Sequence, residues 1–345
     1  MLRALLMQLP RSGYFCRSQI RSWSIQLFAF ALCTLPSTVI KAQIQLHDYP
    51  NKTVTIVVGF SAGSTNDASA RVIARRLSEA FGQQFVVINR EGAAGAMSGV
   101  QVAKSKPDGY TLLWASSATL VTGPAFHGNV GYDPVTDFSP ISIFCYLPYV
   151  IVMNPAVQAE NLKALLDIAR KQPNKLAYGS TGQGGTLHLA FELMQHMSNV
   201  RMVHVPYKGT PSLIIDLLSG QIQLGVMSVN LVVPHVKSGK MRAIGVTSKD
   251  RTSLLPEVPT VDEAGLKGYN VTGWYGLVAP AKTPLPIVTA LNKAFAQSLD
   301  HPEAKAVIVR EGAQAGGESP EHFSQFLSSE RNAYKKLIEE ANLRL

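Results

Sequence analysis

Residues 57–77 read VVGFSAGSTNDASARVIARRL, and this stretch decides the fold of the chain. An apolar strand at Thr53–Val58 leads into a loop of small residues, and an amphipathic helix is predicted over Asn66–Phe81. Ser64 and Asp67 have the S-x-x-D spacing of a helix cap, so the helix should begin directly after Ser64. The stretch is therefore a strand–loop–helix unit.

The same alternation of strands and helices continues along the chain and predicts an α/β fold with largely parallel sheets. A second glycine-rich loop, GSTGQGGT at 179–186, again follows a strand and opens a helix. From Pro284 the sequence is helix-rich. Helices without strands of their own need a sheet to pack on, so we expect the chain to cross back to the first sheet near 272–278. The predicted tail helices span 285–299, 302–310 and 320–343.

Several local patterns bear on the region after the third strand. A small polar loop is predicted at Ser116 and Ser117, and two apolar runs, Ile141–Cys145 and Tyr149–Met153, lead into a new section of the chain. Further on, Thr210 is the predicted N-cap of a helix with proline in its first turn. Trp114, inside an apolar strand, should lie in the core.

Residues 1–42 differ from the rest because they hold five basic residues and no acidic one. Their apolar run, 24–35, is too short to span a bilayer, which favours a cleaved signal peptide and a periplasmic location over an uncleaved anchor helix. Subtracting the five leader bases from 32 leaves 27 against 23 acidic residues, a mild net charge of +4. No dense basic block remains, so nucleic acid is not an expected partner.

Metal and disulfide chemistry are not expected. Cys145 is the one cysteine after the leader, so it has no intramolecular disulfide partner and no multi-cysteine metal site can form. His188, Glu192 and His196 share one helix face, but they extend over two turns, too far for one ion. We therefore predict no metal and no cofactor.

The segment GFSAG at 59–63 matches the G-x-S-x-G signature of serine hydrolases, which raises Ser61 as a nucleophile. That motif needs an oxyanion-donating loop built earlier in the chain, and only about a dozen residues separate the leader from the first strand. The helix also begins after Ser64 rather than next to Ser61. A serine hydrolase is the less favoured alternative.

The two small-residue loops fit anion binding better. Each precedes a helix, whose N-terminal N–H groups and dipole favour negative charge, and glycines allow close approach of the backbone. The phosphate-binding lysine of a P-loop is missing after Gly63, so nucleotide binding is not indicated. One such loop is weak support, but two loops at the carboxyl ends of strands favour a ligand held between two domains.

The mature chain resembles the Bug-type extracytoplasmic solute receptors of tripartite tricarboxylate transport systems. The resemblance extends through nearly the whole chain after the leader. It is carried by YPNKTVTIVVGFSAGSTNDASAR, VVINREGAAGAMSGVQVAKSKPDGYTLL, GYDPVTDFSPIS, KLAYGSTGQGGTLHLA, MVHVPYKGT, SGQIQLGV, PHVKSGKMRAIGVTS and LPEVPTVDEAGLKGY.

The resemblance implies a two-domain, Venus-flytrap fold of the type II-like periplasmic binding proteins and no catalysis. The first domain would comprise 49–147 and 273–345 and the second 148–272, with a small carboxylate held in the cleft. It also implies a monomer that delivers its ligand to a membrane permease, although a sensor role in the same fold stays open. The implied ligand-binding residues are Phe60, Ser61, Gly63, Ser64, Thr65, Asp67, Ser116, Ser117, Thr181, Gly182, Gln183, Gly185, Thr186, His188 and Tyr207.

Two departures from the family pattern bear on the ligand. The family has two adjacent glycines in the first loop, and the second is Ser64 here. Many members also have an aspartate after SGQIQL, where this chain reads Ser228-Val229-Asn230. Since that acid could hold a ligand's ammonium group, its absence predicts a carboxylate that lacks an amine.

Overall fold

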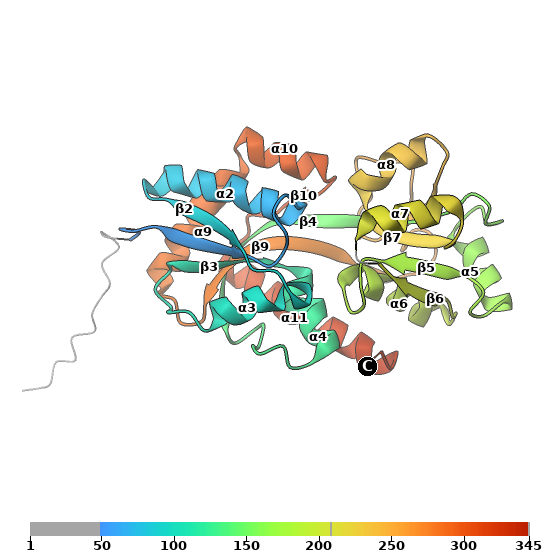
Figure 1. The fold of residues 1–345 in the computed structure, drawn as a ribbon, viewed down its shortest axis with the longest axis horizontal. Coiled ribbons are helices and arrows are strands. Elements are labelled where there is room, and N and C mark those ends of the chain that lie inside the picture. Colours follow the sequence, from blue (N-terminus) through green and yellow to red (C-terminus); the bar gives the residue numbers. More distant parts are fainter. Residues whose placement is uncertain (1–48, 208, 344–345) are drawn as a thin grey trace, which may run out of the picture. The chain divides into compact units, whose positions relative to one another are not determined.

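The computed structural model describes residues 49–343, with residue 208 excepted, so the predicted signal peptide lies outside the described residues. A ten-stranded sheet has the order β2-β1-β3-β9-β4-β7-β5-β6, with β8 and β10 also paired to β4 (Figure 1). The strands are β1 Val54–Val58, β2 Phe85–Asn89, β3 Thr111–Ser116, β4 Phe138–Met153, β5 Ala177–Ser180, β6 Val203–Pro206, β7 Leu224–Ser228, β8 Arg242–Val246, β9 Thr272–Pro280 and β10 Gln314–Ala315.

Helices connect most of the strands, which confirms the α/β class. They are α2 Thr65–Phe81, α3 Ala96–Ala103, α4 Gly123–His127, α5 Leu162–Lys171, α6 Thr186–Ser198, α7 Thr210–Ser219, α8 Val229–Lys237, α9 Leu285–Leu299, α10 Pro302–Arg310 and α11 Pro320–Glu340, with a 3₁₀ turn η2 Ala93–Gly95 and a π-helical turn η3 Ala118–Thr122. In the described part of the chain, no helix is both long and apolar enough to cross a membrane.

The prediction of largely parallel pairing is wrong for the middle of the sheet. β1 pairs in parallel with β2 and β3, and β5 with β6 and β7. In contrast, β9 is antiparallel to β3 and β4, and β4 is antiparallel to β7 and β8. The reason is that β4 leads the chain away from the first group of strands, β1, β2 and β3, and β9 leads it back. These two neighbours therefore run in opposite directions.

β4 contains both apolar runs noted in the sequence, 141–145 and 149–153. It continues through Pro148, pairing with β9 as far as Pro148 and with β7 from Tyr149 onward. Its residues are almost all buried because sheet and helices cover both faces, which explains the continuous apolar sequence. One continuous strand therefore belongs to both groups of strands.

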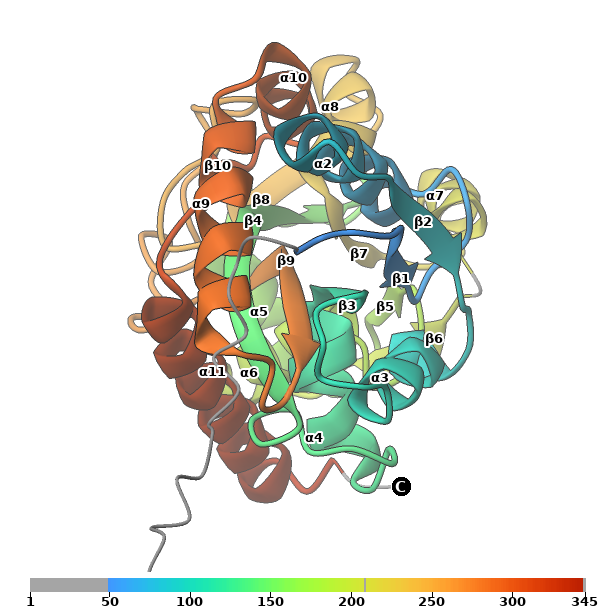
Figure 2. The ribbon, with the colours of Figure 1, turned by 90° about the vertical axis from the view of Figure 1, so that its left-hand side faces the viewer.

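The helices of the tail pack on the first group of strands. Phe295 of α9 stacks on Trp114 of β3, with ring centroids 6.1 Å apart, and both side chains are fully buried with Ile56 of β1. In Figure 2, α2, α9 and α10 lie next to one another, and each of these pairs is in contact. The core position predicted for Trp114 is confirmed.

Three other local predictions differ from the structure. Ser117 is already helical at the start of η3, so the polar loop predicted at Ser116 and Ser117 is wrong. The π-helical turn begins directly after the end of β3. The N-cap of α7 is Gly209 rather than Thr210, which becomes the first helical residue. The predicted end of the last helix at 343 shortens to Glu340.

Candidate functional site

The loop between β1 and α2 is closed by the predicted cap. α2 begins at Thr65, and the Ser64 hydroxyl accepts a hydrogen bond of 3.2 Å from the Asp67 amide. The same hydroxyl donates to the Ser61 carbonyl at 2.8 Å, which folds the loop back onto the helix end. Gly63 has a φ of +82°, a left-handed conformation that glycine adopts without strain. The departure from glycine at Ser64 thus supplies the helix cap.

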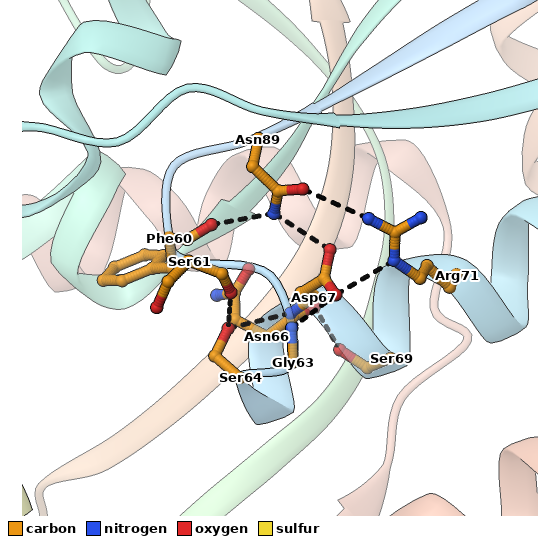
Figure 3. A network of polar contacts seen from close by, with 9 residues as sticks. All are labelled: Phe60, Ser61, Gly63, Ser64, Asn66, Asp67, Ser69, Arg71 and Asn89. Atoms are coloured by element: carbon orange, nitrogen blue, oxygen red, sulfur yellow. Dashed lines mark hydrogen bonds and ion pairs between the residues drawn. The ribbon is translucent and has the colours of Figure 1, made fainter.

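Asp67 holds this loop from inside. Figure 3 shows its carboxylate accepting three hydrogen bonds of 2.9 Å, from the Gly63 amide, the Arg71 Nε and the Asn89 side-chain amide. Asn89 also donates to the Phe60 carbonyl at 2.8 Å and accepts from Arg71 at 3.1 Å. The end of β2 and the first turn of α2 therefore fix both sides of the loop.

The charge of Asp67 is compensated within this network. Only 2% of the residue is exposed, and this burial opposes ionisation. The hydrogen bonds from Arg71, Gly63 and Asn89 outweigh burial and lower the pKa of Asp67. The carboxylate is thus ionised at neutral pH but paired with a guanidinium, which reduces its repulsion of an anion at the helix N-terminus.

Asn66 is a residue that the sequence reasoning missed. It is 3% exposed, and neither atom of its side-chain amide has a hydrogen-bond partner among the described residues. Figure 3 shows this amide on the side of Phe60 and Ser61, away from Arg71. Most buried polar groups are paired, so an unpaired amide at a helix N-terminus is an unusual feature. The sequence feature that could have identified Asn66 is its position beside the cap residues Ser64 and Asp67.

The end of β3 contributes a group of hydroxyls. Ser116 and Thr119 are hydrogen-bonded through their hydroxyls at 3.0 Å, and both are buried. Gly95 lies between this pair and the first loop. A methyl group added to Gly95 would lie 2.6 Å from the Thr119 hydroxyl and 3.4 Å from the Phe60 ring. This close approach brings Phe60 next to the end of β3.

The same turn reaches the second loop directly. The Thr186 hydroxyl lies 3.2 Å from that of Ser117 and 3.3 Å from that of Thr122. All three residues are buried, although 69 residues separate Ser117 from Thr186 in the sequence. Two predicted site residues, Ser117 and Thr186, are thus in contact.

The second loop, 179–186, leads into α6 without a side-chain cap, since its N-cap is Gly185. Thr181 and Gln183 are exposed, whereas Gly184 is buried against the ring of Phe126 in α4. With no side-chain acceptor at Gly185, the first N–H groups of α6 are available to another acceptor. The loop therefore has the backbone features expected of an anion site.

His188 and Tyr207 lie behind this loop. His188 is 5% exposed and accepts a hydrogen bond of 3.1 Å from the Gly184 amide through Nδ1. Tyr207, half-buried at the end of β6, donates to Asp216 of α7 at 2.8 Å. Both side chains are thus engaged with neighbouring protein groups.

The three residues considered for a metal do not converge. His188 Nε2 lies 3.6 Å from Glu192, but His196 pairs instead with Glu340 of α11 at 3.5 Å. Among the residues that the structure describes, no group of three or more metal-ligating side chains is found. The separation over two helical turns explains the different partners.

Ser61 is exposed, and within 49–343 its recorded hydrogen bonds involve only its carbonyl oxygen. Two histidines that could serve a nucleophile as a base have other partners: His188 bonds to Gly184, and His204 lies 2.8 Å from the hydroxyl of Ser180. These two imidazoles thus belong to the second loop. Phe60, Gly63, Ser64 and Asp67 are hydrogen-bonded within the first loop or to Asn89 and Arg71. The Thr65 side chain interacts with Glu311 instead.

Comparisons with known proteins show the family of this chain. Residues 69–343 match the family described as tripartite tricarboxylate transporter family receptor. Protein BugT of Bordetella pertussis is 31% identical over 307 residues, which cover 89% of this chain and 94% of BugT.

Two solved structures from Rhodopseudomonas palustris show the same fold. Rpa4515, solved with adipate, has a TM-score of 0.75 and 34% identity, and the match covers 86% of this chain and 99% of that protein. MatC, solved with malate, has a TM-score of 0.73 and 28% identity, and the match covers 84% of this chain and 100% of MatC. The fold is thus the two-domain α/β fold of periplasmic solute-binding proteins, and this chain belongs to the family of tripartite tricarboxylate transporter receptors of the Bug type.

Proposed function

We propose that the protein captures a small carboxylate without an amino group in the periplasm and passes it to a membrane permease. The observation that carries this proposal is the meeting of Ser117 with Thr186, which joins a hydroxyl cluster at the end of β3 to the N-terminus of α6. Hydroxyls and helix N-termini are hydrogen-bond donors suited to a carboxylate.

The electrostatics of the first loop support an anionic ligand. Asp67 is the one acidic residue in the predicted ligand set, and its carboxylate is occupied by Gly63, Arg71 and Asn89. The N-terminus of α2 therefore keeps a favourable potential for negative charge. We include Asn66 in the site because its unpaired amide could donate to a ligand oxygen after a small movement of the loop.

The segment after β7 supports a ligand that has no amino group. Where many family members have an aspartate, the polar side chain here is neutral Asn230, whose buried Oδ1 has no hydrogen-bond partner among the described residues. A neutral oxygen compensates an ammonium group poorly compared with a carboxylate. Adipate and malate, with which the two Rhodopseudomonas proteins were solved, are both carboxylates without an amine.

We also propose the two domains as 49–147 with 273–345, and 148–272, since β4 changes its pairing partner between Pro148 and Tyr149. Ligand would then bind where loops from both domains meet. The signal peptide of residues 1–42, a monomeric state and the absence of catalysis complete the proposal, and no metal or cofactor is required.

Calorimetry on the secreted protein, freed of bound ligand by unfolding and refolding, tests the ligand class. Adipate and malate should bind with micromolar or tighter affinity, whereas aspartate and glutamate should give no heat of binding. Tight binding of aspartate or glutamate, with adipate and malate inert, would overturn the proposal. Ester hydrolysis lost in a Ser61→Ala variant would instead favour the hydrolase.

A further inference from the structure

Four side chains form a buried cluster beneath the second loop, which we call the imidazole cluster: Tyr178 of β5, His188 and Glu192 of α6, and His204 of β6. The two imidazole rings stack with centroids 4.0 Å apart, and Tyr178 stacks on His204 at 5.0 Å. Capture of a ligand by the two loops does not by itself require two stacked histidines at this place.

The hydrogen bonds define the tautomer of His188. The Gly184 N–H donates to Nδ1 at 3.1 Å, so Nδ1 must carry a lone pair and the proton of the neutral ring is on Nε2. Nε2 faces the Glu192 carboxylate at 3.6 Å. That carboxylate is held in turn by hydrogen bonds from the Tyr178 hydroxyl and from Gln195 at 3.0 Å. Glu192 thus orients the ring that accepts from the loop.

His204 supports the loop through a second route. The Ser180 hydroxyl lies 3.1 Å from the Gly182 carbonyl and 2.8 Å from Nε2 of His204, so the ring is hydrogen-bonded to the residue that begins the loop. Burial, together with the neighbouring His188, lowers the pKa of His204 to about 4. The ring is therefore neutral at physiological pH.

The loop needs such support because its backbone is glycine-rich. Gly182 has a φ of +132° and Gly184 a φ of +74°, and glycines lose more conformational entropy on ordering than any other residue. A loop ordered before the ligand arrives avoids that loss on binding. The ring of Phe126 covers the other side, in edge-to-face contact with His188 at 5.8 Å.

We propose that His188 is a positioning residue, which, oriented by Glu192, holds the Gly182–Gly184 backbone in the conformation that binds the ligand. This inference rests on the proposed function, in which that loop donates to a carboxylate. It gives His188 a role through the backbone rather than through direct contact with the ligand.

The groups packed against His188 keep Glu192 in place beside the ring. The Glu192 carboxylate on the same helix faces Nε2. Tyr178 on β5 is neutral, because burial and the adjacent Glu192 raise its pKa, so its hydroxyl remains a donor to Glu192. The residue facing His188 from α4, Phe126, carries no charge.

Two variants separate positioning from direct contact. In His188→Asn the side-chain oxygen can take the place of Nδ1 as acceptor, whereas His188→Leu provides no acceptor. His196→Asn, on the exposed side of the same helix, is the matched control. The full secreted chain is used, and circular dichroism confirms that each variant is folded.

Hydrogen exchange of the peptide containing residues 182–186, measured without ligand, tests the positioning role independently of the ligand. Exchange of the Gly184 amide should be about tenfold or more faster in His188→Leu and near wild type in the other two variants. Unchanged exchange in His188→Leu, or equally fast exchange in His188→Asn, would overturn the inference.

Binding of adipate is then measured at neutral pH. We expect a loss of about tenfold or more in His188→Leu and near wild-type affinity in His188→Asn. Equal losses in both variants would indicate direct contact and overturn the positioning role. A wild-type protein that ignores adipate and malate would refute the ligand class, while the exchange result would still decide the role of His188.

Discussion

Replacing Asp67 with alanine should destabilise the protein because one carboxylate holds the whole first loop. The substitution removes the acceptor for Gly63, Arg71 and Asn89 together. A hydrogen bond to a charged group contributes about 1.5–3 kcal/mol, but these values cannot simply be summed here. Gly63 is exposed and Arg71 is 47% exposed in its side chain, so water can replace part of what they lose.

The loss of stability in Asp67→Ala therefore comes mainly from the unpaired Asn89 amide and from the cavity left by the Asp67 side chain, since this residue is only 2% exposed. We expect the free energy of unfolding to fall by about 3 kcal/mol for Asp67→Ala, measured by urea denaturation. Asp67→Asn keeps the volume and one acceptor, so it should lose about half as much. Arg71→Gln, the matched control on the exposed side, should lose less than about 1 kcal/mol.

The pH dependence gives a second, independent measure. The pKa of Asp67 is lowered in the folded state, so its stabilisation is complete above the unfolded value of about 4 and is lost as the pH falls through the folded value. The difference in stability between wild type and Asp67→Asn should stay constant from neutral pH to about pH 5 and shrink below about pH 4. An Asp67→Ala variant as stable as Arg71→Gln would refute the network as the element that orders the loop.

Other predictions concern the second loop and the tail. Gly184→Ala should lower the free energy of unfolding by about 1–3 kcal/mol more than Gly182→Ala. The methyl group added at Gly184 would lie 2.4 Å from the Phe126 ring, whereas the space at Gly182 is open. Equal melting temperatures for the two variants would contradict this. Burial raises the pKa of Glu330 to about 7, so ionisation reduces folding stability as the pH rises above the unfolded value of about 4.3. Glu330→Gln should therefore raise the melting temperature more at about pH 8 than at about pH 4, and an equal shift at both would contradict burial of the charge.

Signals that lie within a few residues of one another were readable in the sequence. The cap at Ser64 and the start of α2 follow from side chains three positions apart, which form the expected hydrogen bond. Thr260 and Glu263 likewise form both bonds of a capping box, at 3.1 Å and 2.8 Å, although a turn rather than a helix follows them. Local chemistry was thus predictable even where the larger element was not.

Features that depend on tertiary pairing were not readable. The sequence shows two apolar runs, 141–145 and 149–153, but they belong to one strand, because β9 pairs with β4 through Leu147 and Pro148. Ser116 and Ser117 had the composition of a loop, yet Ser117 is helical and buried against Thr186. In both cases a distant segment supplies the contact that overrides the local preference.

The buried polar groups show the same limit at the site itself. Asn66 and the His188–His204 stack have no distinctive spacing, because their significance comes from burial and from partners on other elements. The sequence identified the backbone loops that could face a ligand, but not the side chains beneath them that order those loops. Asp67 was recognisable since its helix cap is local, whereas His188 acquires its role only when Gly184, Glu192 and His204 are brought around it. Ligand preference in such receptors should therefore depend on the layer behind the loops as much as on the loop residues, and substitutions there should change affinity without touching the ligand.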